Sequence, residues 1–164
     1  MRNLYSFALV VFAVGACGGG SGGGGSAKAA TERSLSQTCG KAHDCRDSFP
    51  PDQGISFEAF FGNTEAECIA NFRMLFSPDD VQASVDAGRI IYDSGDADVC
   101  LDAQAGVTCD QFWGTDDTFV QPPECDTAFI GTVADGDACT ISLDCEGGDD
   151  SNCNEETLVC EPDA

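Results

Sequence analysis

Eleven cysteines in a chain of 164 residues constrain the fold more than any other feature of the sequence. Disulfides at this density are typical of small exported domains, whose hydrophobic core is too small to be stable without covalent links. Cys17 stands apart near the N-terminus, and the remaining ten cysteines can pair completely. We therefore expect an oxidising compartment and disulfide bonds at Cys39, Cys45, Cys68, Cys100, Cys109, Cys125, Cys139, Cys145, Cys153 and Cys160.

The ten cysteines also divide the chain into two parts. Six precede residue 130 and four follow it, so each part can close its own bridges. This parity predicts a disulfide-bonded helical domain over residues 34–130 and a Cys-rich acidic module over residues 131–164. The complete connectivity does not follow from spacing. Cys100 and Cys109 flank a predicted helix end at Gly106, however, and we expect a bridge between them.

Capping residues and hydrophobic periodicity predict about four short helices, and hence a small, mainly α body. Thr64 and Glu67 have the spacing of a capping box, and Ser77-Pro78 is a strong helix start. After the last helix we expect a loop that Phe112 and Trp113 hold against the helices, then a strand, and then a module rich in loops and poor in β-structure. The predicted helices cover residues 34–45, 64–76, 77–88 and 93–106, the loop 110–124 and the strand 128–133.

The N-terminus has the pattern of a signal peptide. A basic start precedes an apolar stretch over residues 4–14, which is too short to span a bilayer. Gly15-Ala16-Cys17 ends this stretch and resembles the lipobox of bacterial lipoproteins. The resemblance implies that residues 1–16 are removed and that the Cys17 thiol carries lipid. The alternative is an ordinary signal peptide cleaved after Ala13 or Ala16, which would leave Cys17 as an odd thiol.

The segment after Cys17 is predicted to be a flexible tether. Its sequence over residues 18–26 is GGGSGGGGS, and such a coil has an end-to-end distance of about 15–18 Å. We assign residues 17–33 to the lipidated cysteine and this tether. Gly18 stands where inner-membrane lipoproteins carry Asp, so by the same resemblance the anchor is in the outer membrane. The body would then lie in the periplasm or on the cell surface of the envelope.

The net charge of −22 limits the partners of the protein. A surface this acidic repels nucleic-acid phosphates and anionic lipid headgroups, so nucleic-acid binding and a polybasic membrane mode are excluded. Membrane attachment then depends on the lipid of Cys17. An extracellular or envelope partner would be a cation, a basic protein or a neutral glycan.

Several segments together resemble the Cys-rich lipoproteins abundant in myxobacteria. They are AGRIIYDSGDADVCLDA, PPEC, AFIGTVADGDAC and LDC. The resemblance implies an exported, lipid-anchored, disulfide-bonded protein and carries no activity to any residue. The cysteine spacing of the tail is also similar to that of Dickkopf N-terminal modules. As in compact extracellular modules of this kind, we favour the interleaved bridges Cys139–Cys153 and Cys145–Cys160.

The sequence offers no catalytic residue that we can assign. His43 is the single histidine, bridged cysteines cannot act as nucleophiles, and no phosphate-binding or nucleophile-elbow motif is present. The protein is therefore predicted not to be an enzyme and to need no cofactor, with calcium as the one exception. Oxygen side chains with the spacing of an EF-hand loop, in which Glu155 replaces the usual glycine, make a candidate calcium site of Asp150, Asn152, Asn154 and Glu161.

These observations predict a lipid-anchored envelope protein that acts as a non-catalytic binding or adhesion module. The alternatives are a purely structural envelope lipoprotein and a weak calcium-dependent interaction module. An exposed apolar or aromatic surface would favour the binding module over the structural protein.

Overall fold

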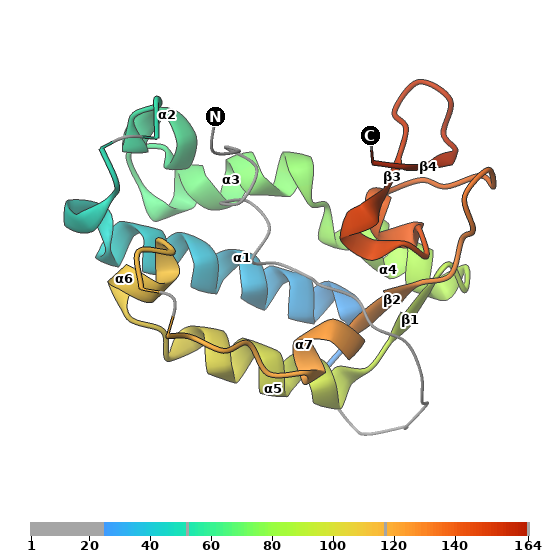
Figure 1. Ribbon diagram of the computed structural model, residues 1–164, viewed down its shortest axis with the longest axis horizontal. Coiled ribbons are helices and arrows are strands. Elements are labelled where there is room, and N and C mark those ends of the chain that lie inside the picture. Colours follow the sequence, from blue (N-terminus) through green and yellow to red (C-terminus); the bar gives the residue numbers. More distant parts are fainter. Residues whose placement is uncertain (1–24, 52, 117, 164) are drawn as a thin grey trace.

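The fold is known from a computed structural model that describes residues 25–51, 53–116 and 118–163 (Figure 1). The predicted signal peptide, residues 1–16, and the lipidation site Cys17 lie outside the described residues. The body is mainly α, as predicted, and among the described helices none is long and apolar enough to cross a bilayer. The helices are α1 (Ala27–Asp44), α2 (Phe57–Phe61), α3 (Glu65–Leu75), α4 (Pro78–Asp86), α5 (Ser94–Ala105), α6 (Cys109–Phe112) and α7 (Glu124–Thr127).

Helix α1 is the central element, with α3 along one side and α5 along the other (Figure 1). It begins at Ala27, so the predicted tether over residues 17–33 and the predicted helix start at Ser34 are wrong at this boundary. The Ser26 hydroxyl accepts the Ala29 N–H at 3.2 Å and caps the helix. Ala27 and Thr31 are buried, so the segment AKAATER, rich in helix-forming residues, packs as helix and does not extend the coil.

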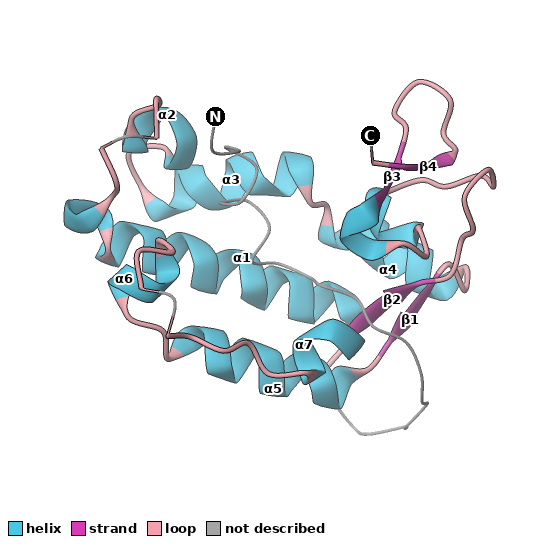
Figure 2. Cartoon of the chain, viewed as in Figure 1, coloured by secondary structure: helices cyan, strands magenta, loops and turns pink. Residues whose placement is uncertain are grey.

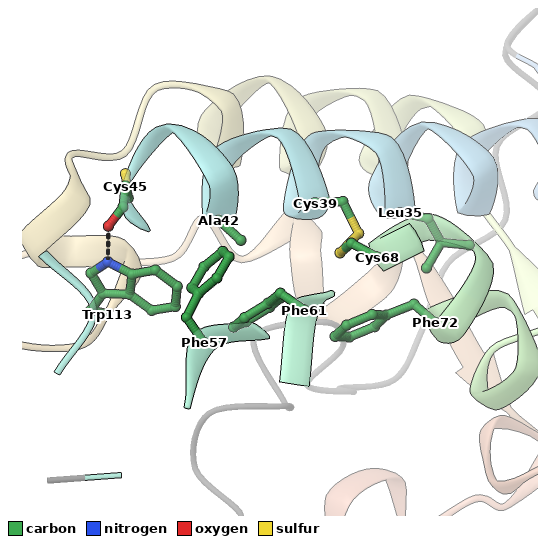
Figure 3. Packing of buried hydrophobic residues seen from close by; sticks show 9 residues of the cluster. All are labelled: Leu35, Cys39, Ala42, Cys45, Phe57, Phe61, Cys68, Phe72 and Trp113. Atoms are coloured by element: carbon green, nitrogen blue, oxygen red, sulfur yellow. Dashed lines mark hydrogen bonds between the residues drawn. A yellow bond between two sulfur atoms is a disulfide. The ribbon is translucent and has the colours of Figure 1, made fainter. Parts of the chain in front are cut away.

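The main core lies between α1 and a group of aromatic side chains (Figure 3). Leu35, Cys39 and Ala42 of α1 face Phe57, Phe61, Phe72 and Trp113. The Trp113 ring is 1% exposed, and its Nε1–H donates to the Cys45 carbonyl oxygen at 2.9 Å. The prediction that Trp113 holds residues 110–124 against the helices is confirmed, although this segment forms the short helix α6 and the start of α7.

The predicted caps at Thr64 and Ser77 are in place, and a third helix is capped by Asp93. The Thr64 hydroxyl accepts the Glu67 N–H, the Ser77 hydroxyl accepts the Asp80 N–H, and the Asp93 carboxylate caps α5. The capping box is incomplete, because the Glu67 carboxylate accepts the Asn63 N–H instead of that of Thr64. These bonds explain why the predicted helix starts agree with the observed ones after residue 60.

Two small antiparallel sheets complete the fold (Figure 2). Strand β1 (Ile90–Tyr92) pairs with β2 (Phe129–Gly131), and Ile90 lies opposite Gly131. The second sheet, β3 (Ser151–Cys153) with β4 (Cys160–Pro162), belongs to the tail. Short 3₁₀ turns over Arg46–Ser48, Ser142–Asp144 and Gly148–Asp150 join the remaining elements.

All ten cysteines of the described residues form disulfides. The bonds are Cys39–Cys68, Cys45–Cys109, Cys100–Cys125, Cys139–Cys153 and Cys145–Cys160. The predicted tail pairing is therefore confirmed, and none of these five bonds crosses residue 130.

The predicted Cys100–Cys109 bridge is wrong. Cys100 lies within α5 and faces α7, where it bonds to Cys125. Cys109 begins α6 on the far side of the turn and bonds to Cys45 at the end of α1. Proximity in sequence was misleading because these two cysteines face different helices.

The Cys-rich tail packs on the helical body through a buried contact. The Asp144 carboxylate, 0% exposed, accepts the Arg89 Nε–H at 2.9 Å and the Thr140 backbone N–H at 2.8 Å. Ile141 and Leu143 pack against the apolar cluster that contains Val81 and Phe129. No described disulfide joins the body to the tail, but side chains of the two parts pack against each other.

Gly131, at the junction of body and tail, has no room for a side chain. A Cβ there would lie 2.2 Å from the Cys145 carbonyl oxygen and 2.7 Å from that of Leu143. We expect Gly131→Ala to lower the free energy of unfolding by about 1–3 kcal/mol in urea denaturation, as overpacked cores do. Gly106→Ala is the control, because its Cβ would come no closer than 3.5 Å to the Ala103 carbonyl oxygen. Equal stabilities of the two variants would contradict the tight junction.

Candidate functional site: an aromatic cleft

A cleft of about 500 Å³ opens beside the C-terminal half of α1. Its walls come from α1, α2, α3, the end of α5, α6 and residues 119–121. This volume is in the range of small-molecule sites in proteins. The aromatic side chains that line it are Phe60, Phe61, Phe72, Phe112, Trp113 and Phe119.

The aromatic wall is held by ring packing. Phe61 packs against Phe60 at 4.8 Å and against Phe72 at 5.9 Å, and Phe112 meets Trp113 at 4.6 Å between ring centroids. Phe61 and Trp113 are buried, whereas Phe60, Phe112 and Phe119 are partly exposed. The partly exposed rings are therefore the apolar surface that a ligand in the cleft would contact.

Two disulfides fix the elements that form the cleft. Cys39–Cys68 joins α1 to α3, and Cys45–Cys109 joins the end of α1 to α6. A wall fixed before binding loses little conformational entropy when a ligand enters. The cleft is thus preorganised.

Polar side chains surround the apolar surface. Gln111 is held in place by hydrogen bonds, since its Oε1 accepts the Thr108 N–H at 2.9 Å and its Nε2–H donates to the Thr118 hydroxyl at 3.2 Å. The Gln37 Oε1 is buried and has no hydrogen-bond partner among the described residues. A buried acceptor without a donor is costly to the fold.

Lys41 supplies the positive charge of the cleft, in contrast to the acidic surface as a whole. Its side chain is half-buried, while Asp44, one helical turn further, is exposed at the rim. In the part of the chain that the structure describes, Lys41 is the one lysine or arginine without an ion pair. The others form Lys28–Asp79, Arg33–Asp98, Arg33–Asp102, Arg46–Glu58, Arg73–Glu32 and Arg89–Asp144.

His43 does not meet a nucleophile in the described residues. Its ring packs edge-on against Phe57 at 5.1 Å, and no hydrogen bond reaches its Nε2. The nearby Ser48 hydroxyl donates to the Cys45 carbonyl oxygen at 3.0 Å. The geometry therefore assigns no catalytic role to His43, and the absence of enzymatic activity stays a prediction.

The candidate calcium ligands lie on the β3–β4 hairpin and the turn before it. The Asn154 Oδ1 accepts the N–H groups of Glu156 and Thr157 at 2.9 and 3.0 Å, and its Nδ2–H donates to Glu161 at 3.0 Å. Asn152 lies opposite Glu161 in the strand register, and Asp150 ends the preceding 3₁₀ turn. The Asn154 side chain is therefore used in hydrogen bonds within the hairpin. Calcium binding at these residues stays a prediction.

A second set of potential metal ligands consists of sulfurs. Cys139, Cys145 and Cys160 place their Sγ atoms within 4.8 Å of one another, but all three are bonded in disulfides. A disulfide sulfur is not a thiolate and does not bind zinc.

No protein-family model, curated protein or solved structure matches this chain. The interpretation of the cleft therefore depends on its own residues. Sequence reasoning treated the helical phenylalanines as core and did not find the cleft. The available signal was the loop over residues 110–124, where Phe112 and Phe119 alternate with the amide side chains of Gln111 and Gln121.

Proposed function

We propose that this protein is an exported envelope lipoprotein that acts as a non-catalytic binding module, anchored in the outer membrane by lipid on Cys17. The aromatic cleft is the observation that carries the binding role. A purely structural lipoprotein has no need of a preorganised cavity of this size, lined by partly exposed aromatic rings. The five disulfides support export to an oxidising compartment.

The position of the cleft suits a protein attached at its N-terminus. Helix α1 starts at Ala27 and is about 27 Å long, and the cleft lies beside its far half, from Ser36 to Asp44. Nine Gly and Ser residues separate Cys17 from this helix and would reach about 15–18 Å. A body held in this way would present the cleft away from the bilayer.

We expect Cys17→Ser to release the protein from the membrane. The full chain would be expressed in a Gram-negative host and the variant compared with the wild type by detergent phase partitioning and by labelling with an alkyne-bearing fatty acid. The wild type should label and enter the detergent phase, and the variant should do neither. Ser21→Cys combined with Cys17→Ser is the control, because it restores a thiol four residues away from the lipobox position. A Cys17→Ser protein that stays membrane-bound would contradict the lipid anchor.

A further inference from the structure

We infer that the cleft binds a long-chain carboxylate, with Lys41 as the counter-ion of its head group and the aromatic wall around its apolar chain. This inference rests on the proposed binding function and specifies its ligand. It differs from the expectation that the net charge alone suggests, which favours cationic or neutral partners.

The charge of Lys41 is the first argument. The chain has 29 Asp and Glu but only 7 Lys and Arg. Apart from Lys41, every described Lys and Arg side chain forms an ion pair with a carboxylate. Lys41 is half-buried at the cleft and lacks such a partner among the residues that the structure describes. A partly desolvated ammonium gains more from an anion than an exposed one does, so a ligand carboxylate would be stabilised there.

The lining of the cleft defines the rest of the ligand. Phe60, Phe112 and Phe119 offer partly exposed apolar surface, which favours an aliphatic chain by removing its methylene groups from water. One lysine matches one monoanionic head. Phosphate sites in proteins often use an arginine fork, and the described lining contains no arginine, so we assign a carboxylate and not a phosphate.

Apart from Asp44, the acidic charge of the described surface opposes an anion in the cleft only at long range. At physiological ionic strength the Debye length is about 8 Å, so charges elsewhere on the surface are largely screened from the cleft. Asp44 also lines the cleft, one helical turn from Lys41, but its side chain is exposed to solvent, which weakens its repulsion of an anion. The local charge therefore determines the choice of head group.

Trp113, the single tryptophan of the chain, lines the cleft and provides the readout. The mature full chain with Cys17→Ser, which has no acyl chain of its own, would be titrated at 150 mM salt with 11-(dansylamino)undecanoate and with its neutral methyl ester. Energy transfer from Trp113 to the dansyl group measures binding. We expect the carboxylate to bind at least about tenfold more tightly than the ester, as is typical of a hydrogen bond to a charged group.

Substitutions at Lys41 test the assignment directly. Lys41→Met should abolish the preference for the carboxylate over the ester, and Lys41→Arg should keep that preference. Lys28→Met is the matched control, because it removes the same charge from an exposed pair with Asp79 outside the cleft lining. Circular dichroism and a thiol assay would verify that each variant is folded and fully bridged.

The outcomes separate the ligand assignment from the proposed function. Equal binding of carboxylate and ester, or an equal effect of Lys28→Met and Lys41→Met, would overturn the role of Lys41 but leave a cleft that binds apolar ligands. Absence of energy transfer with both probes would overturn the cleft as a binding site altogether. Displacement of the probe by an anionic lysophospholipid but not by palmitate would show that the cleft prefers a phosphate head group. This result would overturn our assignment of a carboxylate.

Discussion

Replacing Arg89 by methionine should lower the free energy of unfolding at pH 7 by about 3–5 kcal/mol. Arg89 is the ion-pair partner of Asp144, whose side chain is 0% exposed, and Met keeps much of the length of the arginine while removing its charge. The variant therefore leaves a buried carboxylate without a counter-charge. Removing one partner of a buried ion pair destabilises the folded state because the remaining charge is desolvated and unpaired. Urea denaturation followed by circular dichroism measures the loss.

Arg33→Met provides the matched control. Arg33 pairs with two carboxylates, Asp98 and Asp102, but those side chains are 60% and 74% exposed. Exposed pairs contribute about 0–1 kcal/mol, so the control should be close to the wild type. A loss at Arg89 no larger than that at Arg33 would contradict the view that the Arg89–Asp144 pair holds the tail on the body.

The pH dependence gives a second readout of the buried Asp144 carboxyl. Burial raises the pKa of the Asp144 carboxyl, but hydrogen bonds from Ser84, Thr140 and Ile141 outweigh it, and the pKa lies below its usual value. In the wild type this group therefore contributes stability above about pH 4, and the contribution is lost as the pH falls through the folded-state pKa.

The pH dependence should change in Arg89→Met. Without the guanidinium the pKa of Asp144 should rise, and protonation then relieves the buried charge. The stability difference between wild type and variant should shrink as the pH falls from 7 to 4. A difference that is constant across this range would show that the arginine acts through packing alone.

Local features of the fold could be predicted from the sequence where a single side chain determines the backbone. Ser77 with Pro78 begins α4, Thr64 begins α3 and Asp93 begins α5, because each satisfies N–H groups that a helix leaves unpaired. The start of α1 at Ala27 had a similar signal in Ser26. It was missed because the glycine run before it suggested that the coil continued.

Features that depend on contacts between distant residues could not be predicted. Cys109 bonds to Cys45, 64 residues away, although Cys100 is much closer in sequence. The ion pair of Arg89 with Asp144 crosses the boundary that cysteine parity suggested. The cleft requires α1, α3 and α6 to be placed in space, and periodicity cannot distinguish a ring that fills the core from one that lines a cavity.

Removal of the Cys45–Cys109 bridge by double substitution with alanine should cost about 4 kcal/mol of stability, the largest loss among the five bridges. The bond spans 64 residues, the longest separation, and the chain entropy of the unfolded state that a bridge removes grows with the size of its loop. The Cys139–Cys153 bridge spans 14 residues, and its removal should cost about 3 kcal/mol. Urea denaturation of the two double variants tests this order. A larger loss for the tail bridge would show that strain or residual structure outweighs loop entropy.

The two variants should also differ in the cleft. Cys45 links α1 to α6 through the disulfide, and its carbonyl oxygen accepts the Nε1–H of Trp113, which lines the cavity. Without the bridge, α6 can move away from α1, and Trp113 emission should shift to longer wavelength as water reaches the ring. The affinity for the undecanoate probe should fall at the same time.

The tail variant should keep both the emission and the affinity of the wild type, because Cys139 and Cys153 pack in a separate cluster with Cys145 and Cys160. An unchanged affinity after loss of Cys45–Cys109 would mean that the aromatic rings hold the cleft without the disulfide.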